Sequence, residues 1–394
     1  MKGLLLIISV AADIFLTGCV TTKPPAPSQE ELTSLIRNHL VLLEYPDFEP
    51  VVSRLKNKEI VFLGEVHHVE ALIQTGGALT VALAKKKPAV WAHECCYSTY
   101  PLMEAISMGK EENLIPWNCP ETIQSFNSTH SSEKKILMTA VDIEYSVYKH
   151  KPGTVRFLQF LASRSSSESA TKILNKKIAF LTEQDTFNKM NEYLKDLDCL
   201  FRRHFETFSS EDQEEILFYI DLLKASNRYG YLNQDNDWKK SGSRFWKVYN
   251  IRYRYFNKTI ERAYEKARKC GGILICQLGE WHIDASHRCE AQYFERKYRL
   301  TKGKTASIRL IPLYSDQEKN HSENIPEIDI TVKNLMGNSR YGYLDLNELT
   351  EDAVQMLAWS DYFTHDGPKY DGLLFIHVNT NAESLRSSTK ANSF

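Results

Sequence analysis

Short apolar runs alternate with longer amphipathic segments along most of this chain. The runs that we expect to form strands are residues 60–63, 89–92, 136–143, 273–278, 308–313 and 373–376. The run over residues 60–63 is unbroken, which is typical of a strand that is buried on both faces of a sheet. The pattern therefore predicts an α/β fold, in which flanking helices cover a mainly parallel central sheet.

Helical segments separate the predicted strands. Ser28 and Glu31 have the spacing of a capping box, and we expect them to open a helix that runs through about Leu43. A second helix is expected over residues 69–86. Residues 145–268 are long, polar and helix-rich, with no evident strand. We predict that this region is a helical insertion over the carboxyl edge of the sheet.

The first residues have the pattern of a secretory signal. Lys2 precedes an apolar run over residues 3–15. This run is shorter than the roughly 20 residues that a membrane-spanning helix needs. It ends in residues 16–19 (LTGC), which resemble the bacterial lipobox. In a lipobox the cysteine, here Cys19, is lipidated and becomes the new N-terminus.

The lipobox implies a division of the chain. We expect a signal peptide over residues 1–18, a Pro-rich tether over 19–28 and a single domain over 29–394. Acyl chains on Cys19 would act as a membrane anchor, because each buried CH₂ contributes roughly 0.8 kcal/mol. The lipid bilayer is therefore an expected partner, and the expected location is the bacterial cell envelope, at the outer membrane.

Charge and cysteine content narrow the classes of function. The formal net charge is −1 at pH 7. Without a basic excess to bind phosphates, the chain is not expected to bind nucleic acid. The other cysteines are odd in number once Cys19 is set aside, and no two of them form a CxxC pair. Their pattern indicates neither a disulfide framework nor a zinc site.

Two predicted strands end in the same Gly-Glu-x-His pattern. The first continues into residues 64–68 (GEVHH), and the later one continues into residues 279–282 (GEWH). In α/β sheets ligands collect at the carboxyl ends of the strands, so both motifs should face one crevice. The repeat predicts a site that contains Glu65, His282 and one of the two adjacent histidines.

Two other predicted strands add polar groups to the same edge. Glu94 closes the second strand, and Asp142 and Glu144 lie near the end of the third. Carboxylates and imidazoles together can activate water, transfer protons or bind a metal. Asp142 and Glu144 are equally compatible with solvated or helix-capping roles. His93 and Trp281 are expected to pack or to form the pocket wall.

The order of these motifs resembles a known superfamily. Residues 62–68 (FLGEVHH), followed by Glu94, are similar to the first motif of the superfamily that joins ChaN haem-binding lipoproteins, Tiki proteases and erythromycin esterases. Arg252, residues 279–282 and residues 370–376 (YDGLLFI) are similar to its later motifs, in the same order. The resemblance implies the predicted α/β fold. It offers two enzymatic chemistries and one binding function.

In the esterase branch a histidine of the first motif is the general base that activates water. Carried over to this sequence, the resemblance assigns that role to His68. It gives supporting roles to Glu65, Glu94, Arg252 and His282. The substrate would be a small-molecule ester or amide, which the sequence does not identify.

In the Tiki branch, histidines bind a divalent metal together with a carboxylate. The resemblance then assigns His67 and His282 as metal ligands. Two imidazoles, a carboxylate and an open coordination position form a known catalytic arrangement. The sequence does not decide which of the adjacent residues His67 and His68 faces the site.

The ChaN branch implies binding of haem or iron without catalysis, through an axial histidine or tyrosine. Trp91, Trp281, Tyr97 and Tyr100 are candidate ring surfaces for a haem. We place hydrolysis ahead of haem binding, because clustered carboxylates suit proton transfer better than they suit an apolar haem pocket. A scaffold without catalysis is the third alternative.

Overall fold

The computed structural model describes residues 26–44, 47–67, 69–110, 120–144, 151–233, 242–314, 326–364 and 367–378. The predicted signal peptide and Cys19 lie outside the described residues, as does His68. Within the described ranges, no helix is both long and apolar enough to cross a membrane. No disulfide joins the described cysteines.

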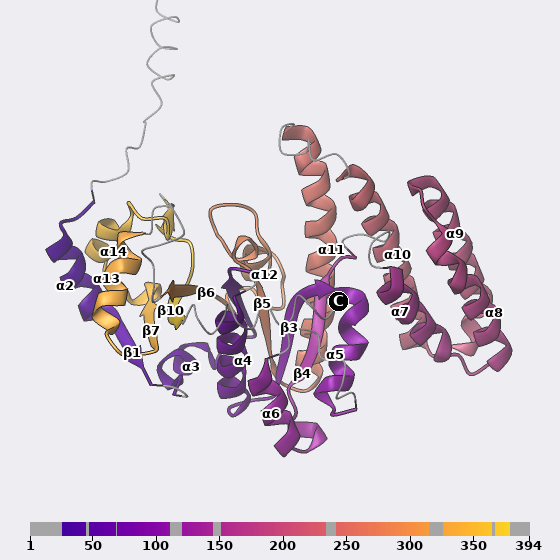
Figure 1. Cartoon of the computed structure of the whole chain (residues 1–394), viewed down its shortest axis with the longest axis horizontal. Coiled ribbons are helices and arrows are strands. Elements are labelled where there is room, and N and C mark those ends of the chain that lie inside the picture. The colour runs from indigo at the N-terminus through magenta and orange to yellow at the C-terminus, as the bar shows by residue number, and fades with distance from the viewer. Residues whose placement is uncertain are drawn as a thin grey trace, which may run out of the picture.

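An eight-stranded sheet runs through the centre of the molecule in the order β1-β7-β10-β6-β2-β5-β3-β4 (Figure 1). Its strands are β1 (Leu40–Leu43), β2 (Ile60–Glu65), β3 (Ala89–Cys96), β4 (Leu137–Asp142), β5 (Ile273–Gly279), β6 (Thr305–Tyr314), β7 (Tyr341–Asp345) and β10 (Gly372–Val378). All the predicted strands are present, and they pair with one another in parallel. The predicted α/β fold with a mainly parallel sheet is therefore confirmed.

The sequence did not predict β1 and β7, which pair antiparallel at one edge of the sheet. The first helix begins at the predicted capping box but ends at His39, and the chain continues as β1. Expecting that helix to reach Leu43 was wrong, because an apolar run fits either element. Val41 and Leu42 are 40% and 48% exposed, so β1 lacks the burial pattern of the central strands. The strands β8 (Phe363–Thr364) and β9 (Gly367–Pro368) form a separate small hairpin.

Helices cover both faces of the sheet. Helices α3 (Glu49–Leu55), α4 (Glu70–Ala84), α5 (Tyr100–Ser107) and α6 (Glu121–Thr129) lie on one side, and α2 (Gln29–His39), α11 (Gly242–Lys269), α12 (Glu290–Arg296), α13 (Glu327–Met336) and α14 (Glu351–Leu357) lie on the other. Alternate strand residues serve the two sides. In β2, for example, Val61 joins the first core and Phe62 the second.

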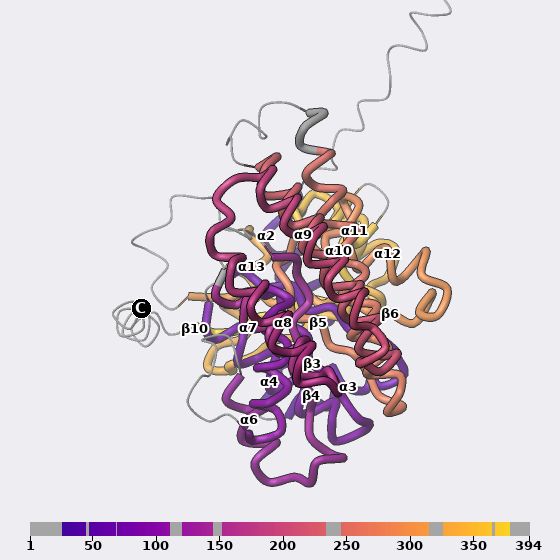
Figure 2. Tube along the Cα trace, turned by 90° about the vertical axis from the view of Figure 1, so that its right-hand side faces the viewer, coloured from indigo at the N-terminus to yellow at the C-terminus, as the bar shows by residue number. Residues whose placement is uncertain are grey.

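The helix-rich region after β4 forms an arm beside β4 and α5 (Figures 1 and 2). Its helices are α7 (Lys151–Ser163), α8 (Glu168–Ala179), α9 (Phe187–Arg203) and α10 (Ser210–Leu232). The last helix of the region, α11, packs directly against β3, β4 and β5. The end of α10 and the start of α11 therefore stand near the carboxyl ends of these strands.

Candidate functional site

A pocket of about 470 Å³ lies at the carboxyl ends of β2, β3 and β5. Side chains from the ends of α10 and α11 and from α12 complete its wall. The pocket brings together five predicted site residues, namely Glu65, His67, Glu94, Arg252 and His282. They come from distant parts of the sequence, and the parallel strand order is what places them together.

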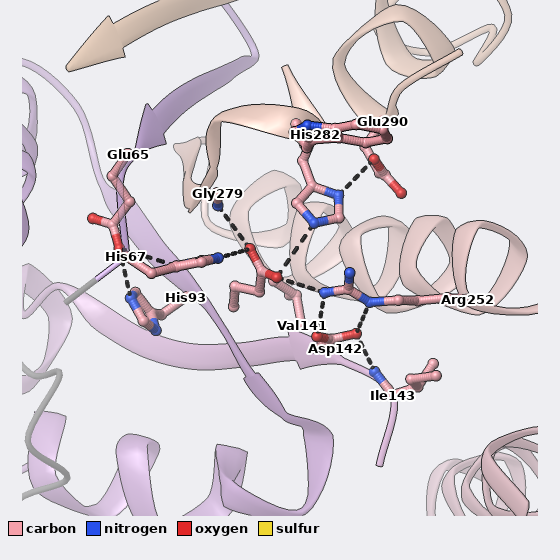
Figure 3. A network of polar contacts seen from close by, with 12 residues as sticks. Glu65, His67, His93, Val141, Asp142, Ile143, Arg252, Gly279, His282 and Glu290 are labelled. Carbon is pink, nitrogen blue, oxygen red and sulfur yellow. Dashed lines mark hydrogen bonds and ion pairs between the residues drawn. The ribbon is translucent and has the colours of Figure 1, made fainter. Parts of the chain in front are cut away.

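Glu94 is at the centre of the site, in contact with four residues that are labelled in Figure 3, namely His67, Gly279, Arg252 and His282. Its Oε1 lies 2.5 Å from Arg252 Nη2 and 3.3 Å from His282 Nε2. Its Oε2 accepts a hydrogen bond from the backbone N–H of Gly279 at 2.7 Å and lies 3.7 Å from His67 Nε2. Burial opposes the charge on Glu94, but the neighbouring His282 and Arg252 hold its pKa well below the ordinary value.

His282 lies between two carboxylates. Its Nδ1 is 2.8 Å from Glu290 Oε2, and its Nε2 faces Glu94. Burial lowers the pKa of His282, but Glu94 and Glu290 outweigh burial and raise it to about 10. At neutral pH the ring is therefore an imidazolium that donates from both nitrogens. The sequence analysis missed Glu290, which is the first residue of the short helix α12 and only 2% exposed.

Arg252 is held by two carboxylates. Its Nε and Nη2 lie 3.2 and 2.8 Å from the two oxygens of Asp142, a bidentate arrangement, while Nη2 also reaches Glu94. Asp142 is fully buried, and its Oδ1 accepts a hydrogen bond from the backbone N–H of Ile143 at 2.7 Å. The guanidinium also stacks over the ring of Phe256 at 5.3 Å. Asp142 is thus neither solvated nor a helix cap, because it fixes Arg252 in place.

Glu65 closes β2 on the other side of the pocket. Its Oε2 accepts a hydrogen bond from Gln277 Nε2 at 2.5 Å, and Gln277 Oε1 accepts one from Trp91 Nε1 at 3.1 Å. Its Oε1 lies 4.0 Å from His67 Nδ1. His67 therefore has a carboxylate near each ring nitrogen, and its side chain is 50% exposed.

His93 packs beneath the pocket rather than lining it. Its ring stacks on Trp91 at 5.2 Å, and its Nε2 lies 3.7 Å from Glu65 Oε1. Neither ring nitrogen has a hydrogen-bond partner among the described residues. Burial lowers the pKa of His93, but Cys95 and Glu65 outweigh it and raise the pKa to about 10. The prediction that His93 packs is confirmed, and the structure adds its contact with Glu65.

Carboxylates and imidazoles therefore alternate across the site (Figure 3). Each side chain in this row of contacts faces the next, in the order Glu290, His282, Glu94, His67, Glu65 and His93. Arg252 joins this row at Glu94 and is itself held by Asp142.

The glycines of the repeated motif allow close packing at the strand ends. A Cβ atom at Gly279 would lie 2.7 Å from His67 Nε2 and 3.3 Å from Glu94 Oε2. A Cβ atom at Gly64 would lie 2.3 Å from Ile283 Cδ1. Any larger residue at Gly279 would displace the imidazole of His67 from the carboxylate of Glu94.

Other sequence-based expectations at this edge had mixed outcomes. Trp281 lines the pocket and is 59% exposed, as expected of a wall residue. Tyr97, Tyr100 and Trp91 lie in the hydrophobic core and do not line the pocket, so they were wrong as candidate haem surfaces. Local sequence does not distinguish an aromatic residue that points into a pocket from one that points into a core.

Glu144 belongs to a separate buried cluster. It accepts hydrogen bonds from the backbone N–H of Ser98 at 2.7 Å and from the Ser98 hydroxyl at 3.1 Å. The hydroxyl of Tyr219, on the arm, lies 3.5 Å away. Burial raises the pKa of Glu144 to about 7. Glu144 does not line the pocket.

The described side chains do not form a metal centre. They contain no group of three or more His, Cys, Asp or Glu placed to hold a metal ion. His67 and His282 do face a shared carboxylate, Glu94. Its oxygens, however, are already engaged by Arg252 and by the N–H of Gly279, and the guanidinium would repel a metal cation at this position. His282 is similarly engaged at both nitrogens, so it does not fit the role of an axial haem ligand.

Comparisons with known proteins establish the fold alone. No protein-family model and no curated protein matches the chain. A solved succinoglycan biosynthesis protein is similar with a TM-score of 0.63 and 13% identity, over 89% of this chain and 98% of that one. A histidine-to-asparagine mutant of the erythromycin esterase EreC, in its open conformation, is similar with a TM-score of 0.56 and 12% identity, over 87% of this chain and 95% of that one. ChaN of Campylobacter jejuni, with cofacial haem, gives a TM-score of 0.31 and 10% identity over 84% and 92%.

Proposed function

We propose that this chain is a hydrolase that activates water with a histidine and cleaves an ester or amide bond in a small molecule. The carrying observation is the half-exposed imidazole of His67, which has Glu65 near one ring nitrogen and Glu94 near the other. Carboxylates beside an imidazole fix its orientation and stabilise the imidazolium that forms when it accepts a proton. The erythromycin esterase with the same fold is consistent with this class of reaction.

In the proposed reaction the oxygen of a bound water attacks the carbonyl carbon while the imidazole takes the proton of that water. The same imidazole then gives the proton to the leaving oxygen or nitrogen as the bond to the carbonyl carbon breaks. Negative charge develops on the carbonyl oxygen, and the cations Arg252 and His282 line the same pocket. Cations that are held in place before the reaction stabilise such charge without reorganising.

Separate substitutions of the two adjacent histidines test the proposal. The measurement is hydrolysis of a chromogenic nitrophenyl ester by the full chain and by His67→Ala, His68→Ala and the control His204→Ala, at the end of α9. Loss of a general base lowers kcat by about 100-fold or more. We expect that loss in His67→Ala, with the control unchanged. The loss in His68→Ala alone would transfer the role of base to His68. Equal activity in all variants would contradict the proposal.

Haem binding is the second candidate function. The aromatic residues Tyr229, Tyr249 and Trp281 line the pocket beside His67, and such rings suit a flat apolar ligand. A visible-absorption titration with haemin tests it. A saturating Soret shift that is lost in His67→Ala would favour haem binding over hydrolysis. A shift that the substitution leaves unchanged would place the haemin elsewhere.

We also propose that Cys19 carries the lipid anchor of an envelope lipoprotein, as its lipobox-like context suggests. Labelling of growing bacteria with radioactive palmitate tests this directly. The label is expected on the full chain, in the outer-membrane fraction, and is expected to be lost in Cys19→Ala. Equal labelling of both chains would contradict the assignment.

A further inference from the structure

Large apolar side chains are exposed around the opening of the pocket. Trp281 and Val66 line the pocket and are 59% and 42% exposed. Trp246, on the helix α11 that forms part of the pocket wall, is 54% exposed. We call these three residues the mouth cluster.

Packing ties Trp246 to the opening. It lies near the start of α11, and its ring meets the ring of the pocket residue Tyr249 at 5.8 Å in an edge-to-face contact. The exposed Tyr231 of α10 does not belong to the mouth cluster, because its ring stacks on Phe187 of α9 at 4.4 Å. The mouth cluster is therefore contributed by three segments, which follow β2 and β5 and begin α11.

The residue types at the mouth are those that favour a membrane surface. Among the described tryptophans, Trp91 is fully buried and Trp359 is partly buried, so the two that are more than half exposed both belong to the mouth cluster. Tryptophan and tyrosine rings are apolar with one polar atom, which suits the headgroup region of a bilayer. Two exposed cations lie nearby. Lys247 follows Trp246 directly in the sequence, and the guanidinium of Arg288 lies over the ring of Tyr253 at 4.1 Å. They would attract anionic headgroups.

The described chain starts in the same upper half of the molecule, although at the other end of its long axis. In Figure 1, α2 begins in the upper half at the left end and α11 begins in the upper half to the right of the sheet, while α6 lies in the lower half. The proposed anchor Cys19 precedes Ala26, the first residue that the structure describes, by seven residues. That length spans at most roughly 25 Å. An acylated Cys19 would therefore hold this side of the molecule close to the bilayer.

We propose that the mouth cluster rests on the bilayer surface, so that the pocket opens into the membrane interface and takes its ligand from there. The inference concerns a lipid surface as partner and does not rest on the proposed hydrolysis. It explains why this opening, beside a set of ionised groups, is rimmed by apolar rings.

Quenching of tryptophan fluorescence by brominated lipids tests the proposal. The full chain is reconstituted in vesicles of phosphatidylethanolamine and phosphatidylglycerol, with and without bromine on the acyl chains. We expect bromine to quench the wild-type fluorescence. Most of that quenching should disappear when Trp246→Phe and Trp281→Phe are combined, because phenylalanine keeps the rim apolar but removes the fluorophores. The control Trp359→Phe should leave the quenching unchanged.

The Cys19→Ser chain, added to the same vesicles, separates the rim from the anchor. We expect weaker quenching that still depends on Trp246 and Trp281. If Cys19 carries no lipid, the Cys19→Ser and wild-type chains should be quenched equally. Quenching that depends on the two tryptophans would still support the proposal in that case. Unquenched fluorescence of the vesicle-bound wild-type chain would overturn it. Quenching that is the same in the double variant would also overturn it.

Discussion

Two carboxylates at the carboxyl edge of the same sheet both have buried side chains but differ in charge. The side chain of Glu94, on β3, is 5% exposed, and Glu144, just beyond β4, is 0% exposed. Glu94 has Arg252 and His282 beside it, and its pKa lies well below the ordinary value. Glu144 accepts hydrogen bonds from the neutral donors of Ser98, and its pKa is raised to about 7.

The difference shows that partners decide the charge of a buried group. Burial opposes ionisation at both positions, but at Glu94 two cations more than offset it. At Glu144 two neutral hydrogen bonds do not. Only Glu94 lines the pocket. A permanent negative charge is therefore placed where a ligand can reach it, while the carboxyl group that titrates near neutrality lies inside, next to the arm.

Replacing Glu94 by glutamine should have the largest effect. Glu94→Gln keeps the shape of the side chain but leaves Arg252 and His282 facing each other without the charge between them. Loss of one partner of a buried ion pair costs about 3–5 kcal/mol. We expect the free energy of unfolding at pH 7, measured with urea, to fall by about this amount. A value unchanged from wild type would show that the cations are not held by Glu94.

The charge on His282 should give the next largest effect, visible as a pH dependence. The folded-state pKa of about 10 exceeds the ordinary 6.5. The bound proton therefore stabilises the fold fully below about pH 6.5, and this stability is lost as pH rises towards 10. Each such proton contributes up to about 1.4 kcal/mol per pH unit. Urea unfolding between pH 7 and 10 should give a slope for His282→Asn that is shallower by about this amount. Parallel slopes would show that His282 is neutral in the folded protein.

The same glutamine substitution at Glu144 should act in the opposite direction. Its folded-state pKa of about 7 exceeds 4.5, so the stabilising proton is fully bound below pH 4.5 and is lost as pH rises through 7. Glu144→Gln supplies a permanently neutral group. We expect the variant to gain about 1–3 kcal/mol over wild type at pH 8, with the gain vanishing near pH 4.5. A loss of stability at pH 8 would mean that Glu144 is ionised and paired.

An exposed ion pair on the arm should give the smallest effect. Lys189 Nζ lies 2.9 Å from Asp185 Oδ1, with side chains that are 59% and 67% exposed. Solvent screens such a pair, which contributes at most about 0.5 kcal/mol. Lys189→Ala should therefore change the midpoint of urea unfolding very little. A loss comparable to that in Glu94→Gln would contradict the view that burial gives an ion pair its energetic weight.

The sequence revealed the strands that contain apolar runs, including β4 at one edge of the sheet. Strands such as β2 and β5 are mostly apolar, and both are fully buried. β7 (YGYLD) lies between β1 and β10 but is short and has no such run. The exposed Val41 and Leu42 of β1 do not distinguish a strand from the end of a helix.

The candidate site was predictable where its residues follow directly from strands. Glu65, Glu94 and His282 each end or follow an apolar run, and the parallel topology brings such ends together. Glu290 and the partnership of Asp142 with Arg252 depend on how α12 and α11 pack. No local pattern encodes such packing. The glycine in each repeat was the informative signal, because Gly279 leaves no room for a Cβ beside His67.

The strand order also has a consequence for how the chain is made. β2 and β3 leave the ribosome early, but in the finished sheet β5 lies between them, and β5 begins only at Ile273. Until the arm and β5 have been synthesised, the edges of β2 and β3 that pair with β5 therefore have no partner in the nascent chain. Unpaired strand edges invite aggregation. A chain that is exported before it folds would avoid this exposure during translation, and its sheet would close only after β5 had followed the arm across the membrane.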